Sequence, residues 1–248
     1  MDVSKSMRLF NSIKNGVNGV GEKIAPKVFS HEFRQKKKNA EILITESRDS
    51  ADYYVMLIVA TLIITFGLLE SNAALIIGGM LVAPVLFPIL ALGLGAAAGR
   101  AALFIRSLRI LISSTILILS ISSGVAYFFD PSDFINYEVE LRLSYSFISV
   151  LVAFFAGFAG AYAWARESLR ANLPGVAIAV ALLPPLCVTG TQLAHGNMDG
   201  VANSFALYGI NVGGIFVASF LVFFFFKYGE VKKVLEKEVK AESEENGI

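Results

Sequence analysis

The sequence predicts an all-α integral membrane protein with six transmembrane helices. Of its 248 residues, 55% are hydrophobic and only 17% are charged, whereas a soluble chain carries about 25% charged residues. The mean hydropathy is +0.65. Long apolar runs separated by short polar breaks fill residues 53–226. These observations exclude an ordinary soluble domain and indicate that most of the chain lies in a bilayer.

The chain divides by charge into three parts. Residues 1–51 form a basic segment that we expect in the cytoplasm, 52–226 form the transmembrane domain, and 227–248 form a charged cytoplasmic tail. Between Val3 and Ile24 apolar residues recur at helical spacing, which predicts an amphipathic helix lying on anionic lipid. Several glycines disfavour that helix, so a loosely ordered tail is an equal alternative. The first long apolar run begins only at Tyr53, so no cleavable signal is expected.

Six apolar runs are long enough to cross a membrane, because about 20 helical residues span a roughly 30 Å hydrocarbon core. They cover 53–69, 73–99, 104–128, 145–164, 174–194 and 201–226. Only Glu70, Ser71 and Asn72 join the first run to the second. We therefore expect the first two helices to form a tight hairpin.

The distribution of Lys and Arg predicts the orientation, since cytoplasmic loops collect these residues. With the N-terminus inside, twenty fall on the cytoplasmic side and only Arg142 falls outside. Both termini are therefore expected in the cytoplasm, and the protein in the cytoplasmic (inner) membrane of a cell.

Composition also argues against several functions. Twenty-one Lys+Arg against 20 Asp+Glu give a net charge of +1, which disfavours a nucleic-acid-binding protein. The single cysteine, Cys187, and two distant histidines offer no metal ligand set, and no nucleophile and base are paired within the spans. We expect no enzyme activity, no metal and no cofactor.

Two spans are interrupted by proline, one in each half of the membrane domain. Pro84 and Pro88 lie near the centre of 73–99, and Pro184 and Pro185 near the centre of 174–194. Six spans split into three plus three, and an odd number of spans in each half requires any internal repeat to be inverted. The halves share no convincing residue-by-residue identity, so this prediction depends on span count and proline placement.

Proline lacks an N–H and crowds the carbonyl four residues earlier. These prolines should therefore free the carbonyls of Met80, Pro84, Val180 and Ala181. An unpartnered carbonyl in hydrocarbon costs several kcal/mol, so it must face water, a polar side chain or a solute. With Asn211 of the sixth span, these groups predict a midplane site that prefers a cation or a donor-bearing polar solute. An interhelical hydrogen bond is the preferred alternative role of Asn211. The alternative is an ordinary pair of kinks satisfied by neighbouring helices.

Other polar residues near the spans are weaker candidates. Glu70 and Asn72 in the first hairpin could form a gate, and Thr189 and Gln192 could line an outer path. For Glu70 a solvated loop carboxylate is the preferred interpretation, and Thr189 and Gln192 could equally be interface residues near the helix end. Asp, Glu, Lys and Arg are all missing from the centres of the spans, which argues against proton coupling.

At the interrupted spans the sequence resembles the domain of unknown function 389, also described as an uncharacterised hydrophobic domain. The matching blocks are GLLESNAALIIGGMLVAPVLFPI, from Gly67 to Ile89, and LPGVAIAVALLPP, from Leu173 to Pro185. The family tends to show IGAM where this chain has IGGM. The resemblance extends over about 47–226 and implies a multi-pass prokaryotic-type membrane protein without established biochemistry. Many larger relatives carry a soluble domain before the spans, for which 51 residues are too few.

From these features we expect a transporter or channel that passes a small polar solute or ion between two halves that rock or gate against each other. The alternative is a structural or assembly protein whose kinks only shape helix packing. A hydrated cavity beside the prolines would discriminate between them. Small-residue ladders in several spans suit close packing within or between subunits, which leaves a homo-oligomer open.

Overall fold

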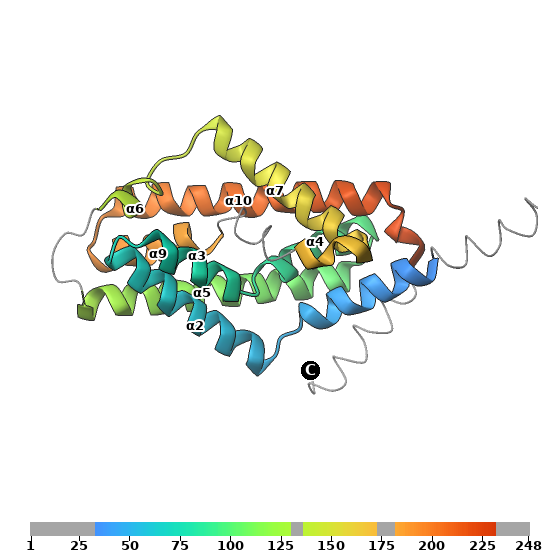
Figure 1. The fold of residues 1–248 in the computed structure, drawn as a ribbon, viewed down its shortest axis with the longest axis horizontal. Helices are drawn as coiled ribbons and strands as arrows, with labels where there is room; N and C mark the ends of the chain where they lie inside the picture. Colours follow the sequence, from blue (N-terminus) through green and yellow to red (C-terminus); the bar gives the residue numbers. More distant parts are fainter. Residues whose placement is uncertain (1–32, 130–135, 173–181, 232–248) are drawn as a thin grey trace, which may run out of the picture.

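The computed structural model describes residues 33–129, 136–172 and 182–231, and every regular element in these ranges is helical (Figure 1). The predicted all-α class is therefore confirmed. Four helices are long and apolar enough to cross a membrane: α2 (Ala51–Leu69), α5 (Ala101–Phe129), α7 (Phe147–Ala165) and α10 (Met198–Phe225). A fifth span arises if α3 (Ala73–Val82) and α4 (Leu86–Ala97), which meet at an angle of 50°, are counted as one.

The second half of the predicted fifth run forms the short helix α9 (Leu183–Ala194), while its first half lies outside the described residues. The remaining elements are short. They are a helix over 33–46, α6 (Tyr137–Glu140), η1 (Glu167–Asn172) and η2 (Tyr228–Val231). The predicted amphipathic helix between Val3 and Ile24 and the tail beyond Val231 also lie outside the described ranges.

The long helices α5 and α10 form the frame of the molecule, and the short helices α4 and α9 pack between them (Figure 1). Helix α4 lies at the N-terminal part of α5, where Gly95 approaches the backbone of Phe104. Helix α9 lies at the C-terminal part of α5, where Gly190 approaches Ser122. Helices α4 and α9 therefore lie at opposite ends of the frame formed by α5 and α10, and each of them begins near the middle of that frame.

Prolines explain where the short helices begin. Ala83 has the extended conformation that a residue before proline prefers (φ −72°, ψ 124°), and it ends α3. Pro88 then falls in the first turn of α4, where no helical N–H partner is required. Pro184 and Pro185 fall in the first turn of α9 for the same reason. The prolines thus mark starts of helices.

Equivalent turns follow the two short helices. Gly99 (φ 62°) and Gly196 (φ 72°) have left-handed backbones, which glycine adopts without a steric penalty. The N–H of Arg100 donates to the carbonyl of Gly95 at 2.8 Å, and the N–H of Asn197 donates to that of Gln192 at 3.0 Å. Each bond closes a helix with the same C-terminal motif, and the second turn follows the first by 97 positions.

The same spacing relates the buried faces of the helices that follow. All but one of the buried residues of α10 lie 97 positions after a buried residue of α5, the exception being Ala218. Serines recur within this set, as Ser107 and Ser204 and as Ser122 and Ser219. Helices α2 and α7 are both 19 residues long. Each buried residue of α7 lies 96 positions after a buried residue of α2, and Tyr53 is the one buried residue of α2 without a buried counterpart.

Small residues allow α7 and α10 to pack closely within the chain. Gly157 approaches the Cα of Ile215, and Gly214 approaches Ala153. At least part of the small-residue ladder of α7, namely Ala153 and Gly157, therefore mediates helix packing within one chain.

Candidate functional site

A cavity of about 360 Å³ lies beside the break between α3 and α4. Its walls include the last residues of α3, Pro84 and the start of α4 on one side, and the segment that leads into α2 on the other. The described residues around it include two carboxylates, Glu46 and Asp52, but no Lys or Arg. The cavity therefore combines a broken helix with negative charge.

The break changes the backbone hydrogen bonding next to this cavity. The N–H of Ala83 still donates to Gly79 at 3.2 Å, but proline at position 84 has no N–H to offer the carbonyl of Met80. The prediction that the carbonyl of Pro84 is also free was wrong, because the N–H of Phe87 donates to it at 3.3 Å. A tight turn into α4 replaces the lost helical bond. Met80 is buried in the last turn of α3, and Pro88 is buried at the start of α4.

Hydroxyl pairs connect three helices near this level of the frame. Tyr53, which lines the cavity, shares a hydrogen bond of 2.8 Å with Ser114 of α5. Tyr54 pairs with Ser113 at 2.7 Å. The next residue of α5, Thr115, pairs with Tyr208 of α10 at 2.8 Å. Hydrogen bonds to Ser113, Ser114 and Thr115 of α5 thus connect this helix to both α2 and α10.

The second break is packed where the structure describes it. Every residue from Leu183 to Gln192 is buried, Pro184 and Pro185 included. Val180 and Ala181, whose carbonyls were predicted to be free acceptors, lie outside the described residues. Asn211 is 7% exposed in the middle of α10. The two breaks therefore differ, because the first borders a cavity and the described part of the second is enclosed by α5 and α10.

The two residues predicted to line an outer path make contacts between helices. Thr189 donates to the carbonyl of Pro185 at 2.9 Å and pairs with Ser204 of α10 at 2.9 Å. Gln192 accepts a hydrogen bond of 2.7 Å from Asn197 at the start of α10. Both are at most 2% exposed, which fits the alternative given from sequence, that they are interface residues.

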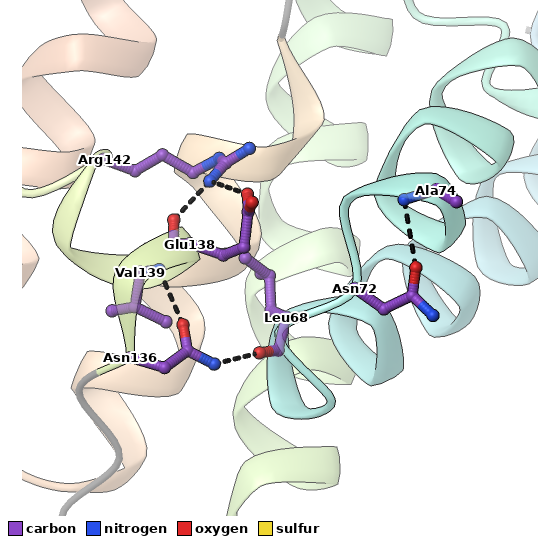
Figure 2. Close-up of polar contacts among 7 residues, drawn as sticks. All are labelled: Leu68, Asn72, Ala74, Asn136, Glu138, Val139 and Arg142. Atoms are coloured by element: carbon purple, nitrogen blue, oxygen red, sulfur yellow. Dashed lines mark hydrogen bonds and ion pairs between the residues drawn. The ribbon is translucent and has the colours of Figure 1, made fainter.

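The two hairpin residues predicted as a gate lie at the far end of α2. Glu70 is exposed, and its N–H donates to Phe66 at 2.9 Å. Asn72 caps α3 by accepting a hydrogen bond of 3.0 Å from the N–H of Ala74 (Figure 2). Beside them, Asn136 donates to the carbonyl of Leu68 at 2.7 Å (Figure 2). These contacts close the hairpin and connect it to α6.

Sequence reasoning missed the contribution of the helix over 33–46. Leu43 and Ile44 of this helix are almost fully buried in the core. Arg106 of α5 donates to the carbonyl of Ile44 at 2.8 Å, and to the carbonyl and hydroxyl of Ser47 at 3.1 and 2.9 Å. This anchor holds Glu46 at the cavity. The signal available was the spacing of Asn39, Ala40, Leu43, Ile44 and Ser47, which defines one helical face.

Among the described residues, no three His, Cys, Asp or Glu side chains gather closely enough to hold a metal ion. Cys187 is buried in α9. The polar side chains that line the cavity beside Pro84 are therefore carboxylates and hydroxyls.

Comparison with known proteins identifies a family. The model for the domain of unknown function DUF389 matches residues 80–217. An uncharacterised protein of Methanocaldococcus jannaschii is 29% identical over 201 residues, which cover 77% of this chain and 62% of the archaeal protein. The match thus spans less than two thirds of that relative's length. No solved structure matches the chain.

Proposed function

This chain belongs to the family of the domain of unknown function DUF389, and we propose that it is a transporter or channel for a small cation or donor-bearing polar solute. The observation that carries the proposal is the cavity beside Pro84, lined by the broken helix and by Glu46 and Asp52. Cavities and irregular backbone at membrane depth are typical of transport pathways, because hydrocarbon cannot satisfy exposed carbonyls.

The proposal includes a six-span topology with both termini in the cytoplasm of a cell bounded by its inner membrane. The bent pair α3 and α4 would form the second span, and α9 with the residues before it would form the fifth. The excess of Lys and Arg on one side supports this orientation, because Arg142 alone falls on the other. The helix over 33–46 and the cavity would then lie towards the cytoplasm.

We further propose that the two halves are inverted repeats. The constant spacing of 97 between the turns at Gly99 and Gly196 supports this relationship, as do the matching buried faces of α5 and α10. In the proposed topology α4 and α9 run in opposite directions from the middle of the membrane. This is the geometry of broken helices around a midplane site.

The difference between the two breaks supports alternating access. In inverted repeats, one half adopts the open form while the other adopts the closed form, and exchange of these forms moves the opening across the membrane. Here the break at Pro84 borders a cavity, whereas the start of α9 at Pro184 is buried. The structure would then represent a state open towards the helix over 33–46.

The charge of the cavity supports a cationic or donor-bearing solute. Glu46 and Asp52 attract cations, and the hydroxyl-bearing residues Thr45, Ser50 and Tyr53 line the same cavity. An anionic solute would meet two carboxylates and no compensating basic residue among the described lining.

Flux into liposomes tests the proposal. The purified protein is reconstituted and offered Na⁺, K⁺, small amines and neutral polar metabolites. We expect flux of at least one cation or amine, reduced about tenfold when Glu46→Gln and Asp52→Asn are combined, because the carboxylates concentrate the solute at the entrance. Glu41→Gln is the matched control, since Glu41 lies on the same helix and pairs with Lys37 at 3.6 Å.

Two results would contradict the proposal. Folded protein that passes none of these solutes would favour the structural or assembly role. Flux unchanged when Pro84 and Pro184 are both replaced by alanine would separate transport from the breaks. Retained thermal unfolding cooperativity in the variants verifies that they are folded.

A further inference from the structure

A second cavity, of about 520 Å³, lies where three segments meet at one end of the molecule. Its walls come from the helix over 33–46, the end of α7 with η1, and the end of α10 with η2. These segments converge at the end of Figure 1 to which the helix over 33–46 extends. The cavity is separate from the break at Pro84, since the described residues of the two linings do not overlap.

The chemistry of this cavity differs from that of the first. Lys36 and Arg166 bring positive charge, and Gln35, Asn39, Ser168 and Tyr228 bring polar groups. Glu167 is the one acid among the described lining residues, and Lys38 pairs with it at 2.9 Å. The described lining residues, counted together with Lys38, therefore carry a net positive charge.

Arg166 is held in a way that suits an anion. Its guanidinium carbon lies 5.3 Å from the ring centre of Phe226 and 6.0 Å from that of Tyr162. An arginine that stacks on aromatic rings through the face of its guanidinium keeps its N–H edge for paired hydrogen bonds with a phosphate. The aromatic rings also supply an apolar wall beside the positive charge.

Hydrogen bonds fix the position of Asn39, which lines this cavity. Asn39 is 2% exposed, and its side-chain amide N–H donates to the carbonyl of Ala165 at 3.1 Å. Its backbone carbonyl accepts a hydrogen bond of 3.1 Å from the indole N–H of Trp164. Its amide oxygen accepts from Arg170, whose guanidinium stacks on Trp164 at 5.0 Å. The cation of Arg170 thus adds to the field at the base of the cavity without occupying it.

We propose that this cavity binds a phosphate-bearing anion, and that the head group of an anionic phospholipid is its source. The cavity lies beside the ends of two long apolar helices and combines aromatic walls with basic groups. That pairing matches a lipid, whose charged head group adjoins apolar chains. A bound head group would bridge the helix over 33–46 to the ends of α7 and α10.

Thermal unfolding in a neutral detergent tests the proposal without reference to solute flux. Phosphatidylglycerol should raise the unfolding midpoint by about 2–4 °C relative to phosphatidylcholine, because a ligand that binds only the folded state stabilises it. Inorganic phosphate is added in a parallel experiment. If phosphate alone gives the same rise, the site takes phosphate from solution; if only the lipid does, the head group is the ligand.

Variants assign the effect to this cavity. Arg166→Gln and Lys36→Gln together should remove at least half of the rise. Arg34→Gln should retain it, because Arg34 is exposed on the same helix and does not line the cavity. The proposal is overturned if both lipids stabilise equally and phosphate has no effect, or if Arg34→Gln loses as much as the double variant.

Discussion

Gly190 of α9 packs directly against Ser122 of α5, so closely that a methyl group on the glycine would overlap the serine hydroxyl. The carbonyl of Leu119 would lie 3.0 Å from the same methyl group. Gly93 of α4 meets Ser219 of α10 in the same manner. The two pairs correspond when α4 is exchanged with α9 and α5 with α10, because Gly190 lies 97 positions after Gly93 and Ser219 lies 97 positions after Ser122.

We predict that Gly190→Ala destabilises the protein by about 1–3 kcal/mol, because overpacking forces the helices apart. Thermal unfolding in detergent measures this as a fall of several degrees in the midpoint. Gly124→Ala is the matched control, since nothing lies within 4 Å of its added methyl group. Ser122→Gly should restore stability to Gly190→Ala. Equal stability of the two alanine variants would refute the close contact.

The anchor at Arg106 predicts the stability of the helix over 33–46. Arg106→Gln removes charge-assisted hydrogen bonds to Ile44 and Ser47, each worth about 1.5–3 kcal/mol. Amide hydrogen exchange in this helix should accelerate about tenfold or more, since about 1.4 kcal/mol changes an opening equilibrium tenfold. Arg109→Gln, an exposed neighbour on α5, should leave exchange unchanged, and acceleration in both variants would count against the anchor.

Asn72 should act as a helix cap, so its loss should lower stability more than it alters solute selection. Asn72→Ala removes the acceptor for Ala74 and Leu75 at 3.0 and 3.3 Å, which costs about 1 kcal/mol. Asn72→Asp and Asn72→Ser should retain most of this stability. A gate role would instead appear as altered solute selectivity in Asn72→Ser with thermal stability intact.

The cavity beside Pro84 should admit water-soluble thiol reagents. Cys187 is buried, so the native chain should react slowly and Ala83→Cys should react readily. A cationic methanethiosulfonate should modify Ala83→Cys about three- to tenfold faster than an anionic one, after correction for their rates with a free thiol, because Glu46 and Asp52 concentrate cations. The preference should fall when both acids are neutralised, and its persistence would remove them from the cavity.

Tyr228 predicts a change in stability at alkaline pH. Burial raises the pKa of its phenol above 10, although its hydrogen bond with Asn39 and the charges of Arg170 and Arg166 oppose this shift. The stability from keeping the phenol neutral is therefore complete below about pH 10 and declines as the unfolded chain ionises above it. Tyr228→Phe should reduce the decline between pH 9.5 and 11 by up to about 1.4 kcal/mol per pH unit. An identical pH profile in thermal unfolding would show that Tyr228 ionises equally in both states.

The correspondence at a spacing of 97 illustrates where sequence reasoning was limited. Identical residues occur 97 positions apart at Pro88 and Pro185, Gly93 and Gly190, and Gly99 and Gly196. They are too sparse to stand out among many apolar residues that resemble each other by composition. They become recognisable once the backbone shows that they share a helix start, a close approach and a left-handed turn.

The sequence alone determined the membrane class, four of the spans, the break at Pro84 and the family resemblance. These depend on local properties, namely the length of apolar runs and the chemistry of proline, and so they can be read along the chain. Only the tertiary structure revealed which helix faces meet, why Thr189 and Gln192 are buried, and how Glu46 and Asp52 come to lie beside Pro84. The physical reason is that lipid is as apolar as a protein core, so hydrophobic periodicity does not distinguish a buried face from a lipid-facing one.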